Sequence, residues 1–347
     1  MRSRLAAACA ALALTAACSS APAQEAPIEG VLKPPAQPTS GPGGSDYPHG
    51  DFTVTEGGEG HDAWFVFQPA DPVPDDAPLA IMTHGYYEYA GYQQIAAMVE
   101  HTVRQGAVVI YPRWQTDVAD PCPGPYDIEP CMDSVVAGIT GGLDFLASDD
   151  ATVSPRLDET SYFGFSFGGI LTTNMANRHS DLPIPEPKAI FIEDPHSGAT
   201  DEHPVDDDLS GIPATTWFEC HSGATGIIGE AGKVGASCNA IFPKLGHLPA
   251  DRKALVMTRD DWSASPPLAS THGVCAGPGN DPYEWEVNAY DWNFCWKVWD
   301  ALREAVSTGE PPVAAIADSP EHRSLGEWSN GRPVEELVVL KDGALEP

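Results

Sequence analysis

Short apolar runs alternate with longer helical segments along most of this chain, between about residues 79 and 306. The runs expected to form buried strands are 79–83, 107–111, 160–163, 188–192, 214–218 and 254–257. Helical spacing of apolar residues occupies 91–105 and 132–147, and a Trp-rich amphipathic segment, 284–306, closes the series. Strands separated by helices need crossover connections. The pattern therefore predicts an α/β fold, with a mostly parallel central sheet of about eight strands and helices on both faces.

Both ends of this region carry further strand patterns. Residues 52–55 and 63–67 alternate polar and apolar side chains on either side of a glycine-rich turn, 56–60, which is typical of a hairpin. Near the C-terminus, 337–340 is a candidate edge strand.

Length and charge limit the classes of protein. A chain of 347 residues is long enough for one large α/β domain or two small ones. It has 50 acidic against 18 basic residues and a formal net charge of −32, spread along the sequence rather than blocked. This balance argues against nucleic acids and anionic membrane surfaces as partners, and it is typical of a solvated, soluble surface.

The first residues have the pattern of an export signal, which we place at 1–18. Arg2 and Arg4 precede an Ala/Leu-rich core, and small residues precede Cys18. The core is too short to span a bilayer as a helix. Residues 14–18 resemble a bacterial lipobox, which implies lipidation of Cys18 and a cell-envelope lipoprotein, although Thr15 stands where the pattern prefers Leu. Cleavage after Ala23 and release as a secreted protein is the alternative.

Composition divides the rest of the chain into three parts. Residues 19–48 are rich in Pro, Ser, Gly and Ala, which predicts a flexible tether. We assign 49–310 to a catalytic domain and 311–347 to a C-terminal extension for which the sequence suggests no function.

Six cysteines remain after Cys9 and Cys18 are set aside, and an even number in an exported chain favours disulfides. No C-x-x-C pair supports the competing interpretation, zinc binding. Six cysteines allow fifteen pairings. The simplest pairs neighbours along the chain: Cys122 with Cys131, Cys220 with Cys238, and Cys275 with Cys295.

The strongest functional signal is Gly164-Phe165-Ser166-Phe167-Gly168. It follows a predicted strand and opens a predicted helix, the setting in which a G-x-S-x-G serine becomes a nucleophile. The glycines allow a tight turn that raises the Ser166 hydroxyl at its apex. A free hydroxyl is a poor nucleophile, so Ser166 needs a base within hydrogen-bond reach. The sequence contains no H-E-x-x-H, P-loop or dinucleotide motif, and we expect neither a cofactor nor a metal.

With these motifs, residues 50–310 resemble the α/β-hydrolase superfamily. Three parts carry the resemblance in the family's order: His84-Gly85 after a central strand, the Ser166 motif after a later strand, and His272 after the last. The resemblance implies an α/β-hydrolase fold, Ser166 as nucleophile and His272 as the base. Two other histidines, His221 and His247, precede the last strand and are rivals of His272.

The acid of such a triad is less certain from sequence. Asp194, in Glu-Asp-Pro after a strand, resembles the acid of some lipases in the superfamily and is ranked first. Glu219, at the predicted end of the next strand, is the second candidate. Asp260 and Asp261 also precede His272, but we expect them to cap a loop.

The resemblance also implies an oxyanion hole made of two backbone N–H groups. One donor would be Phe167, directly after the nucleophile. The other would come from the loop after His84-Gly85, at Tyr86, although Tyr86 and Tyr87 replace the glycines of a lipase-type His-Gly-Gly-Gly run. An alternative hypothesis is that the side chains of Tyr86 and Tyr87 line the pocket for the acyl group.

Together these features predict an exported serine hydrolase that cleaves a small-molecule or polymeric carboxylic ester through an acyl-enzyme on Ser166. A peptidase or acyltransferase of the same fold is a second hypothesis. A binding lipoprotein that keeps the fold without turnover is a third. The sequence leaves substrate, acyl-chain length and oligomeric state open.

Overall fold

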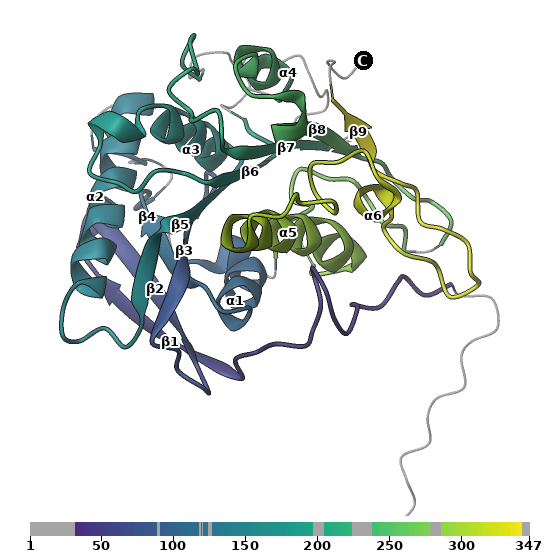
Figure 1. The fold of residues 1–347 in the computed structure, drawn as a ribbon, viewed down its shortest axis with the longest axis horizontal. Helices are drawn as coiled ribbons and strands as arrows, with labels where there is room; N and C mark the ends of the chain where they lie inside the picture. The colour runs from purple at the N-terminus through teal and green to yellow at the C-terminus, as the bar shows by residue number, and fades with distance from the viewer. Residues whose placement is uncertain are drawn as a thin grey trace, which may run out of the picture. The chain divides into compact units, whose positions relative to one another are not determined.

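A computed structural model describes residues 32–88, 91–117, 119, 121–123, 127–196, 205–223, 238–264, 266–277 and 286–341. Within these residues nine strands form one mixed sheet in the order β1-β2-β4-β3-β5-β6-β7-β8-β9 (Figure 1). The strands are β1 (Asp51–Gly57), β2 (Ala63–Ala70), β3 (Asp76–Thr83), β4 (Val108–Arg113), β5 (Ser154–Phe165), β6 (Ala189–Glu193), β7 (Trp217–Gly223), β8 (Lys253–Thr258) and β9 (Val338–Leu340). The helices are α1 (Ala96–Arg104), α2 (Ile128–Leu146), α3 (Phe167–Asn177), α4 (Cys238–Ile241), α5 (Trp296–Thr308) and α6 (Pro320–Arg323).

The predicted α/β architecture with a mostly parallel sheet is confirmed. The six central strands, β4 to β8 in sheet order, run parallel, whereas β1, β2 and β9 pair antiparallel at the edges. The expected hairpin is β1 with β2, and the candidate edge strand near the C-terminus is β9.

Each face of the sheet buries its own apolar core. Successive residues of a strand point to opposite faces, so that Tyr162 enters one core and Phe163 the other. Helices α2 and α3 cover the first core, and α1 and α5 cover the second (Figure 1). The side chains that fill both cores are mostly apolar and fully buried. Because each central strand is buried on both faces, its sequence is a nearly continuous apolar run.

The strand order reverses between β3 and β5. From β3 the chain moves outward to β4, then crosses back so that β5 pairs with the other side of β3. In open α/β sheets such a reversal leaves a crevice at the carboxyl ends of the strands, where ligands bind. Ser166 follows β5 directly and therefore stands at this position.

Several strands differ from their predicted bounds, among them β5, which begins at Ser154 instead of residue 160, and the difference at β7 concerns a candidate site residue. The run 214–218 was expected to end before Glu219, but β7 begins at Trp217 and continues to Gly223, buried throughout. The polar residues inside it have buried partners: Glu219 contacts His322, and His221 contacts Thr258. Polar side chains that have hydrogen-bond partners can be buried in a central strand, so the charged residue Glu219 did not mark the end of β7.

The expected tether, 19–48, needs correction for its second half; residues 19–31 lie outside the described residues. Residues 32–48 run along the domain rather than away from it. Trp292 Nε1 donates to the Pro35 carbonyl at 3.2 Å, and the Gly43 N–H donates to Asp300 at 2.9 Å. Specific contacts with α5 and the turn before it fix this segment, despite its linker-like composition.

The C-terminal boundary is corrected as well. Residues 311–341 belong to the same compact unit as the sheet, through β9 and through buried side chains such as Leu325 and Trp328. The Lys297 ammonium group of α5 donates to three carbonyls of this segment, those of Glu321, His322 and Ser324. Residues 342–347 lie outside the described part.

The six cysteines in the described part of the chain form three disulfides, with the pairing of neighbours that the sequence favoured. They join Cys122 to Cys131, Cys220 to Cys238, and Cys275 to Cys295. Disulfides persist in oxidising compartments, so the protein is suited to an environment outside the cytoplasm.

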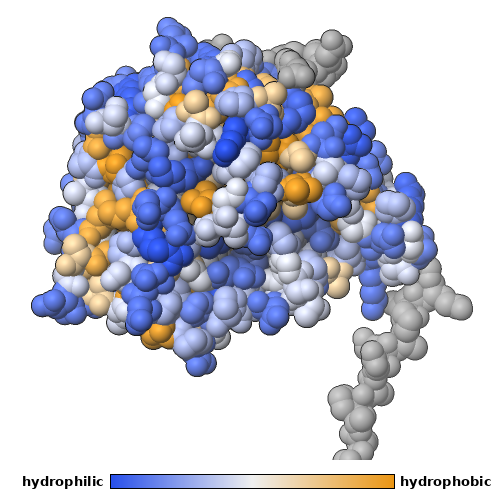
Figure 2. Space-filling view, in the orientation of Figure 1, coloured by the Kyte–Doolittle hydropathy of each residue, from blue (hydrophilic) through white to orange (hydrophobic). Residues whose placement is uncertain are grey.

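The surface follows the composition. The face seen in Figure 2 is mostly hydrophilic, with apolar residues in small scattered patches. No helix in the described residues combines the length and apolar character needed to cross a membrane. The predicted signal, 1–18, and Cys18 lie outside the described residues.

Candidate active site

Ser166 occupies a sharp turn between β5 and α3, as the motif predicts. Its φ of +54° and ψ of −124° lie in a region that side-chain-bearing residues rarely adopt. The flanking glycines leave no room for a side chain: a Cβ on Gly164 would lie 2.7 Å from the Gly168 carbonyl oxygen, and one on Gly168 would lie 2.2 Å from that of His84. The turn therefore places the serine at the carboxyl end of β5, directly before the first residue of α3.

Three predicted side chains meet in one hydrogen-bonded chain. His272 Nε2 lies 2.9 Å from Ser166 Oγ, and His272 Nδ1 lies 2.7 Å from Asp194 Oδ2. A carboxylate can only accept a hydrogen bond, so His272 Nδ1 carries a proton and donates it to the hydrogen bond with Asp194. His272 Nε2 is then unprotonated and can accept the proton of Ser166 Oγ. Ser166 and His272 are less than a tenth exposed. This is the geometry of a nucleophile, its base and an orienting acid.

Asp194 reaches this position because it is the first residue after a central strand. It follows β6 directly, with a φ of +40°, and its N–H donates to the carbonyl of His221 in β7 at 2.9 Å. One residue earlier, the Glu193 carbonyl accepts from the N–H of Ser166 at 2.9 Å. The end of β6 thus fixes both the nucleophile turn and the acid.

His272 lies on a long loop after β8 that is anchored within a few residues after the histidine. Three residues later, Cys275 is bonded to Cys295, in the turn that precedes α5. Gly277 exchanges backbone hydrogen bonds with the start of α1, where its N–H donates to the Gln94 carbonyl and its carbonyl accepts from the N–H of Ala97. A base supplied by a loop is therefore held by a covalent bond and by contacts to two helices.

The alternative acids lie elsewhere. Glu219 is buried in the middle of β7, where its Oε1 pairs with His322 Nε2 at 3.2 Å. The Asp260 carboxylate accepts from the N–H of Ser270, and Asp261 accepts from Trp328 Nε1. All three have structural partners, and His272 contacts Asp194 instead.

The rival histidines also have other partners. His221 Nε2 lies 2.9 Å from the hydroxyl of Thr258, inside the sheet. His247 Nε2 lies 2.9 Å from the Ile212 carbonyl. Of the three histidines weighed in the sequence, His272 is the one that contacts Ser166.

The two residues expected to form an oxyanion hole flank the nucleophile. Phe167 is buried and is the first residue of α3. Its N–H therefore belongs to the first turn of a helix, where the helix dipole favours negative charge. Tyr86 lies in the loop after β3, next to Gly85, on which a Cβ would lie only 2.9 Å from Ser166 Cβ. The loop therefore packs directly against the nucleophile turn.

His84, whose motif helped to define the resemblance, supports this loop. Burial lowers its pKa to about 3, so the ring is neutral, and its Nδ1 lies 2.7 Å from the Gly85 carbonyl oxygen. The ring stacks on Trp114 with centroids 5.0 Å apart. These contacts give His84 a structural role. The side chain of Gln94, which no sequence motif marked, forms hydrogen bonds with the same loop.

Two buried acids lie close to the candidate triad. Burial, together with the nearby Asp194 and Asp291 carboxylates, raises the pKa of Glu193 well above its ordinary value. Burial also raises the pKa of Asp291 well above its ordinary value. A raised pKa favours the uncharged form of each carboxyl, and for Glu193 that form avoids repulsion with the Asp194 carboxylate. Neither acid was predicted, because a lone carboxylate in a sequence carries no mark of its burial.

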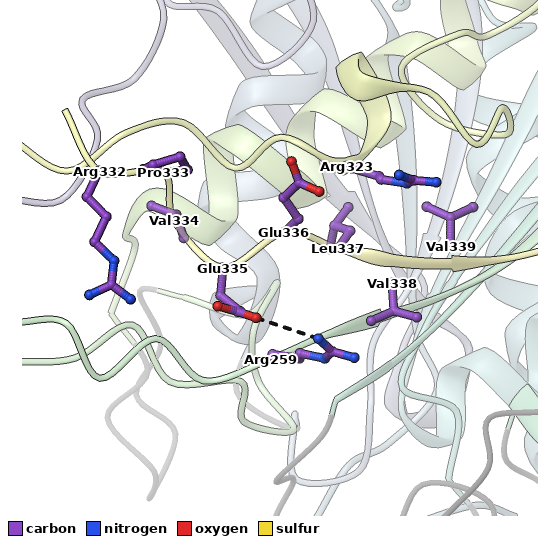
Figure 3. Close-up of a pocket in the computed structure, with 10 residues that line it drawn as sticks. All are labelled: Arg259, Arg323, Arg332, Pro333, Val334, Glu335, Glu336, Leu337, Val338 and Val339. Carbon is purple, nitrogen blue, oxygen red and sulfur yellow. Dashed lines mark ion pairs between the residues drawn. The ribbon is translucent and has the colours of Figure 1, made fainter.

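A further pocket of about 570 Å³ lies against the C-terminal segment, between residues 332–339 and the side chains of Arg259 and Arg323 (Figure 3). None of the triad candidates lines it. Its charges are largely balanced, since Arg259 lies 3.5 Å from Glu335 and Arg323 pairs with Asp318. Within the described residues no group of three or more His, Cys, Asp or Glu side chains is arranged to hold a metal ion.

Comparison with protein-family models gives no match for this chain, and comparison with curated proteins gives none either.

Proposed function

We propose that the protein is a serine hydrolase with an α/β-hydrolase fold and that it cleaves carboxylic esters. The observation that carries this proposal is the continuous chain from Ser166 Oγ through the His272 ring to the Asp194 carboxylate. The nucleophile turn, the order of the three residues along the sequence and the strand order of the sheet agree with it.

In the proposed reaction, Ser166 Oγ attacks the ester carbonyl while His272 Nε2 takes the serine proton. The carbonyl oxygen becomes an oxyanion, bound by the N–H groups of Phe167 and Tyr86. Collapse of this intermediate breaks the ester bond, and the proton on His272 passes to the departing alcohol. Water then attacks the acyl-enzyme with His272 as base, which releases the acid and restores Ser166. Asp194 keeps His272 in the required tautomer throughout.

The export signal and Cys18 extend this proposal to location. We propose that the hydrolase is exported and carried on the cell envelope by a lipid on Cys18, or released if cleavage occurs after Ala23. The three disulfides are compatible with either outcome.

A p-nitrophenyl ester assay combined with a fluorophosphonate probe tests the function. The wild type should turn over the ester and be labelled at Ser166. Ser166→Ala should retain less than ~10⁻⁴ of the wild-type rate and should lose the label. Ser134→Ala, a buried serine of α2 outside the site, is the matched control and should keep both.

The alternatives give different results in the same experiment. A labelled protein that cleaves an amide or transfers the acyl group to an alcohol faster than it hydrolyses esters would be a peptidase or an acyltransferase. A wild type that is neither labelled nor active would contradict the hydrolase proposal and favour a binding protein.

A further inference from the structure

The side chain of Gln94 spans the part of the loop that carries the Tyr86 N–H. The Gly85 N–H donates to Gln94 Oε1 at 2.7 Å, and Gln94 Nε2 donates to the Tyr86 carbonyl at 3.0 Å. Gln94 is 3% exposed and lies in the 3₁₀ turn Gln93–Ile95, which precedes α1. One amide group thus fixes the backbone on both sides of the N–H that we assign to the oxyanion hole.

His84 also fixes the peptide between Gly85 and Tyr86, through the Gly85 carbonyl. As a neutral ring it donates from Nδ1 to the Gly85 carbonyl, which belongs to the same peptide as the Tyr86 N–H. In a trans peptide the C=O and N–H bonds point in opposite directions. A carbonyl that is held toward His84 therefore directs the Tyr86 N–H away from it.

The following peptide is fixed by a second buried glutamine. The Tyr87 N–H donates to Gln115 Oε1 at 2.8 Å, and Gln115 is fully buried. Tyr87 has a φ of +78°, a conformation that costs roughly 1 kcal/mol or more for a residue other than glycine. Side-chain hydrogen bonds hold the loop in a shape that its own sequence disfavours.

This loop has little freedom to move relative to the nucleophile. A Cβ on Gly85 would lie 2.9 Å from Ser166 Cβ, so the loop backbone packs closely against the nucleophile turn. A movement of the loop relative to Gln94 would break the two hydrogen bonds that join them. A donor aimed in advance stabilises an oxyanion without reorganisation during the reaction, which is why such donors have large effects on kcat.

We propose that Gln94 is a positioning residue for the hydrolytic step: its side-chain amide sets the orientation in which the Tyr86 N–H meets the oxyanion. The inference rests on the proposed function and adds to it a residue outside the proposed triad. Gln115 and His84 support the same loop, and of these three side chains Gln94 binds on both sides of the Tyr86 N–H.

The test compares Gln94→Met, which removes both hydrogen bonds, with Gln94→Glu, which keeps an acceptor for Gly85 and loses the donor to Tyr86. Gln68→Met is the matched control. Gln68 is also a buried glutamine, 2% exposed, whose Oε1 accepts from the N–H groups of Thr152 and Val153, far from Ser166 in the fold. The measurements are kcat and KM for a p-nitrophenyl ester, the melting temperature, and inhibition by a trifluoromethyl ketone that forms an oxyanion on the serine.

For Gln94→Met we expect kcat to fall by about 10²-fold, near the lower end of the effect of losing one oxyanion donor, with KM changed less than about threefold. Trifluoromethyl ketone inhibition should weaken in proportion to kcat, a change that lost stability does not produce. Gln94→Glu should lower kcat and ketone affinity by more than about threefold but less than Gln94→Met does, since it loses one of the two hydrogen bonds. Gln68→Met should lower the melting temperature to a similar extent and keep kcat.

If either Gln94 variant folds and keeps kcat and ketone affinity within about threefold of Gln68→Met, well short of the loss of an oxyanion donor, the inference is overturned. Gln94→Glu decides the matter if Gln94→Met does not fold. Failure of the proposed function looks different, because the wild type and Gln68→Met would then also be inactive and unlabelled, and the inference would fail with it.

Discussion

The N–H of Ser166 donates to the carbonyl of Glu193 at 2.9 Å. This bond joins the nucleophile turn after β5 to the last residue of β6, and the next residue is Asp194. The distance between nucleophile and acid is therefore set by two adjacent parallel strands at the centre of the sheet. Only His272 has to be brought in by a loop.

The strained turn at Ser166 predicts that two small substitutions differ in stability. Ser166→Ala keeps a Cβ in the unusual conformation, whereas Ser166→Gly removes it. We expect the glycine variant to be more stable than the alanine variant by about 1 kcal/mol, despite the greater flexibility of glycine in the unfolded chain. Urea unfolding of both inactive variants measures this difference. Equal or reversed stabilities would show that the turn is not strained.

Substitution of the acid should separate the two candidates. Asp194→Asn leaves the contact to His272 but favours the wrong tautomer, and we expect kcat to fall by roughly 10⁴-fold. Glu219→Gln, at the buried contact with His322, should lower stability and keep kcat per folded molecule. Steady-state kinetics with active-site titration checks both. The opposite pattern would assign the acid to Glu219.

The buried carboxyl of Glu193 predicts a pH dependence of stability. Its pKa is raised in the folded state, so between the ordinary Glu value and this raised value the folded protein binds more protons than the unfolded chain. This group's contribution is therefore fully present below the ordinary pKa and is lost as pH rises, by up to about 1.4 kcal/mol per pH unit.

Glu193→Gln should remove that slope, so its stability relative to the wild type should increase from pH 5 to pH 8. Denaturant unfolding at both pH values measures the change. Glu310→Gln, at an exposed position, is the control and should follow the wild type. A Glu193→Gln variant with an unchanged pH slope would mean that Glu193 ionises in the folded protein as it does in the unfolded chain.

The bond between Cys275 and Cys295 anchors the loop of His272, so its removal should affect activity more than its effect on stability explains. Replacement of both cysteines by serine is expected to cost about 3 kcal/mol and to lower kcat at temperatures where the protein stays folded. The Cys220–Cys238 bond closes a stretch of similar length, 18 against 20 residues, and serves as the control. A double variant of Cys275 and Cys295 with wild-type kcat would show that the other contacts suffice to place His272.

The N-terminal segment predicts an effect of truncation. A chain that begins at residue 49 lacks the contacts of Pro35 with Trp292 and of Gly43 with Asp300, which a chain that begins at residue 32 retains. We expect the shorter chain to melt several degrees lower, since 1 kcal/mol corresponds to about 2–4 °C in a domain of this size. Calorimetry of the two chains measures the difference. Equal melting temperatures would support the original interpretation of a tether.

Much of the fold and of the candidate site could be predicted because the signals are local. The hairpin, the central strands and the turn at Ser166 each depend on residues within a short window. The placement of His272 could be predicted because it follows the last parallel strand, and parallel strands end at one edge of the sheet.

The remaining features depend on residues far apart in the sequence. In the sequence, Asp194 and Glu219 look alike, because each is a carboxylate after an apolar run. In the structure β7 continues past Glu219, and the side chain of Glu219 binds His322, 103 residues away. The segment 32–48 has the composition of a linker, and its docking depends on Asp300, 257 residues after Gly43. Gln94 shows its role only when the loop after β3 is folded over it.

The pairing of Lys33 with Ser329 has a consequence for biosynthesis. The Lys33 N–H donates to Ser329 Oγ, and the Ser329 N–H donates to the Lys33 carbonyl, each at 3.0 Å. A polypeptide that leaves the ribosome N-terminus first can complete this pairing only after residue 329 has been translated. Until then the surface that residues 32–48 cover lacks this segment, and exposed apolar surface makes a nascent chain prone to aggregation. The N-terminal segment therefore reaches its native position late in synthesis, after the strands β1 to β8 have been made.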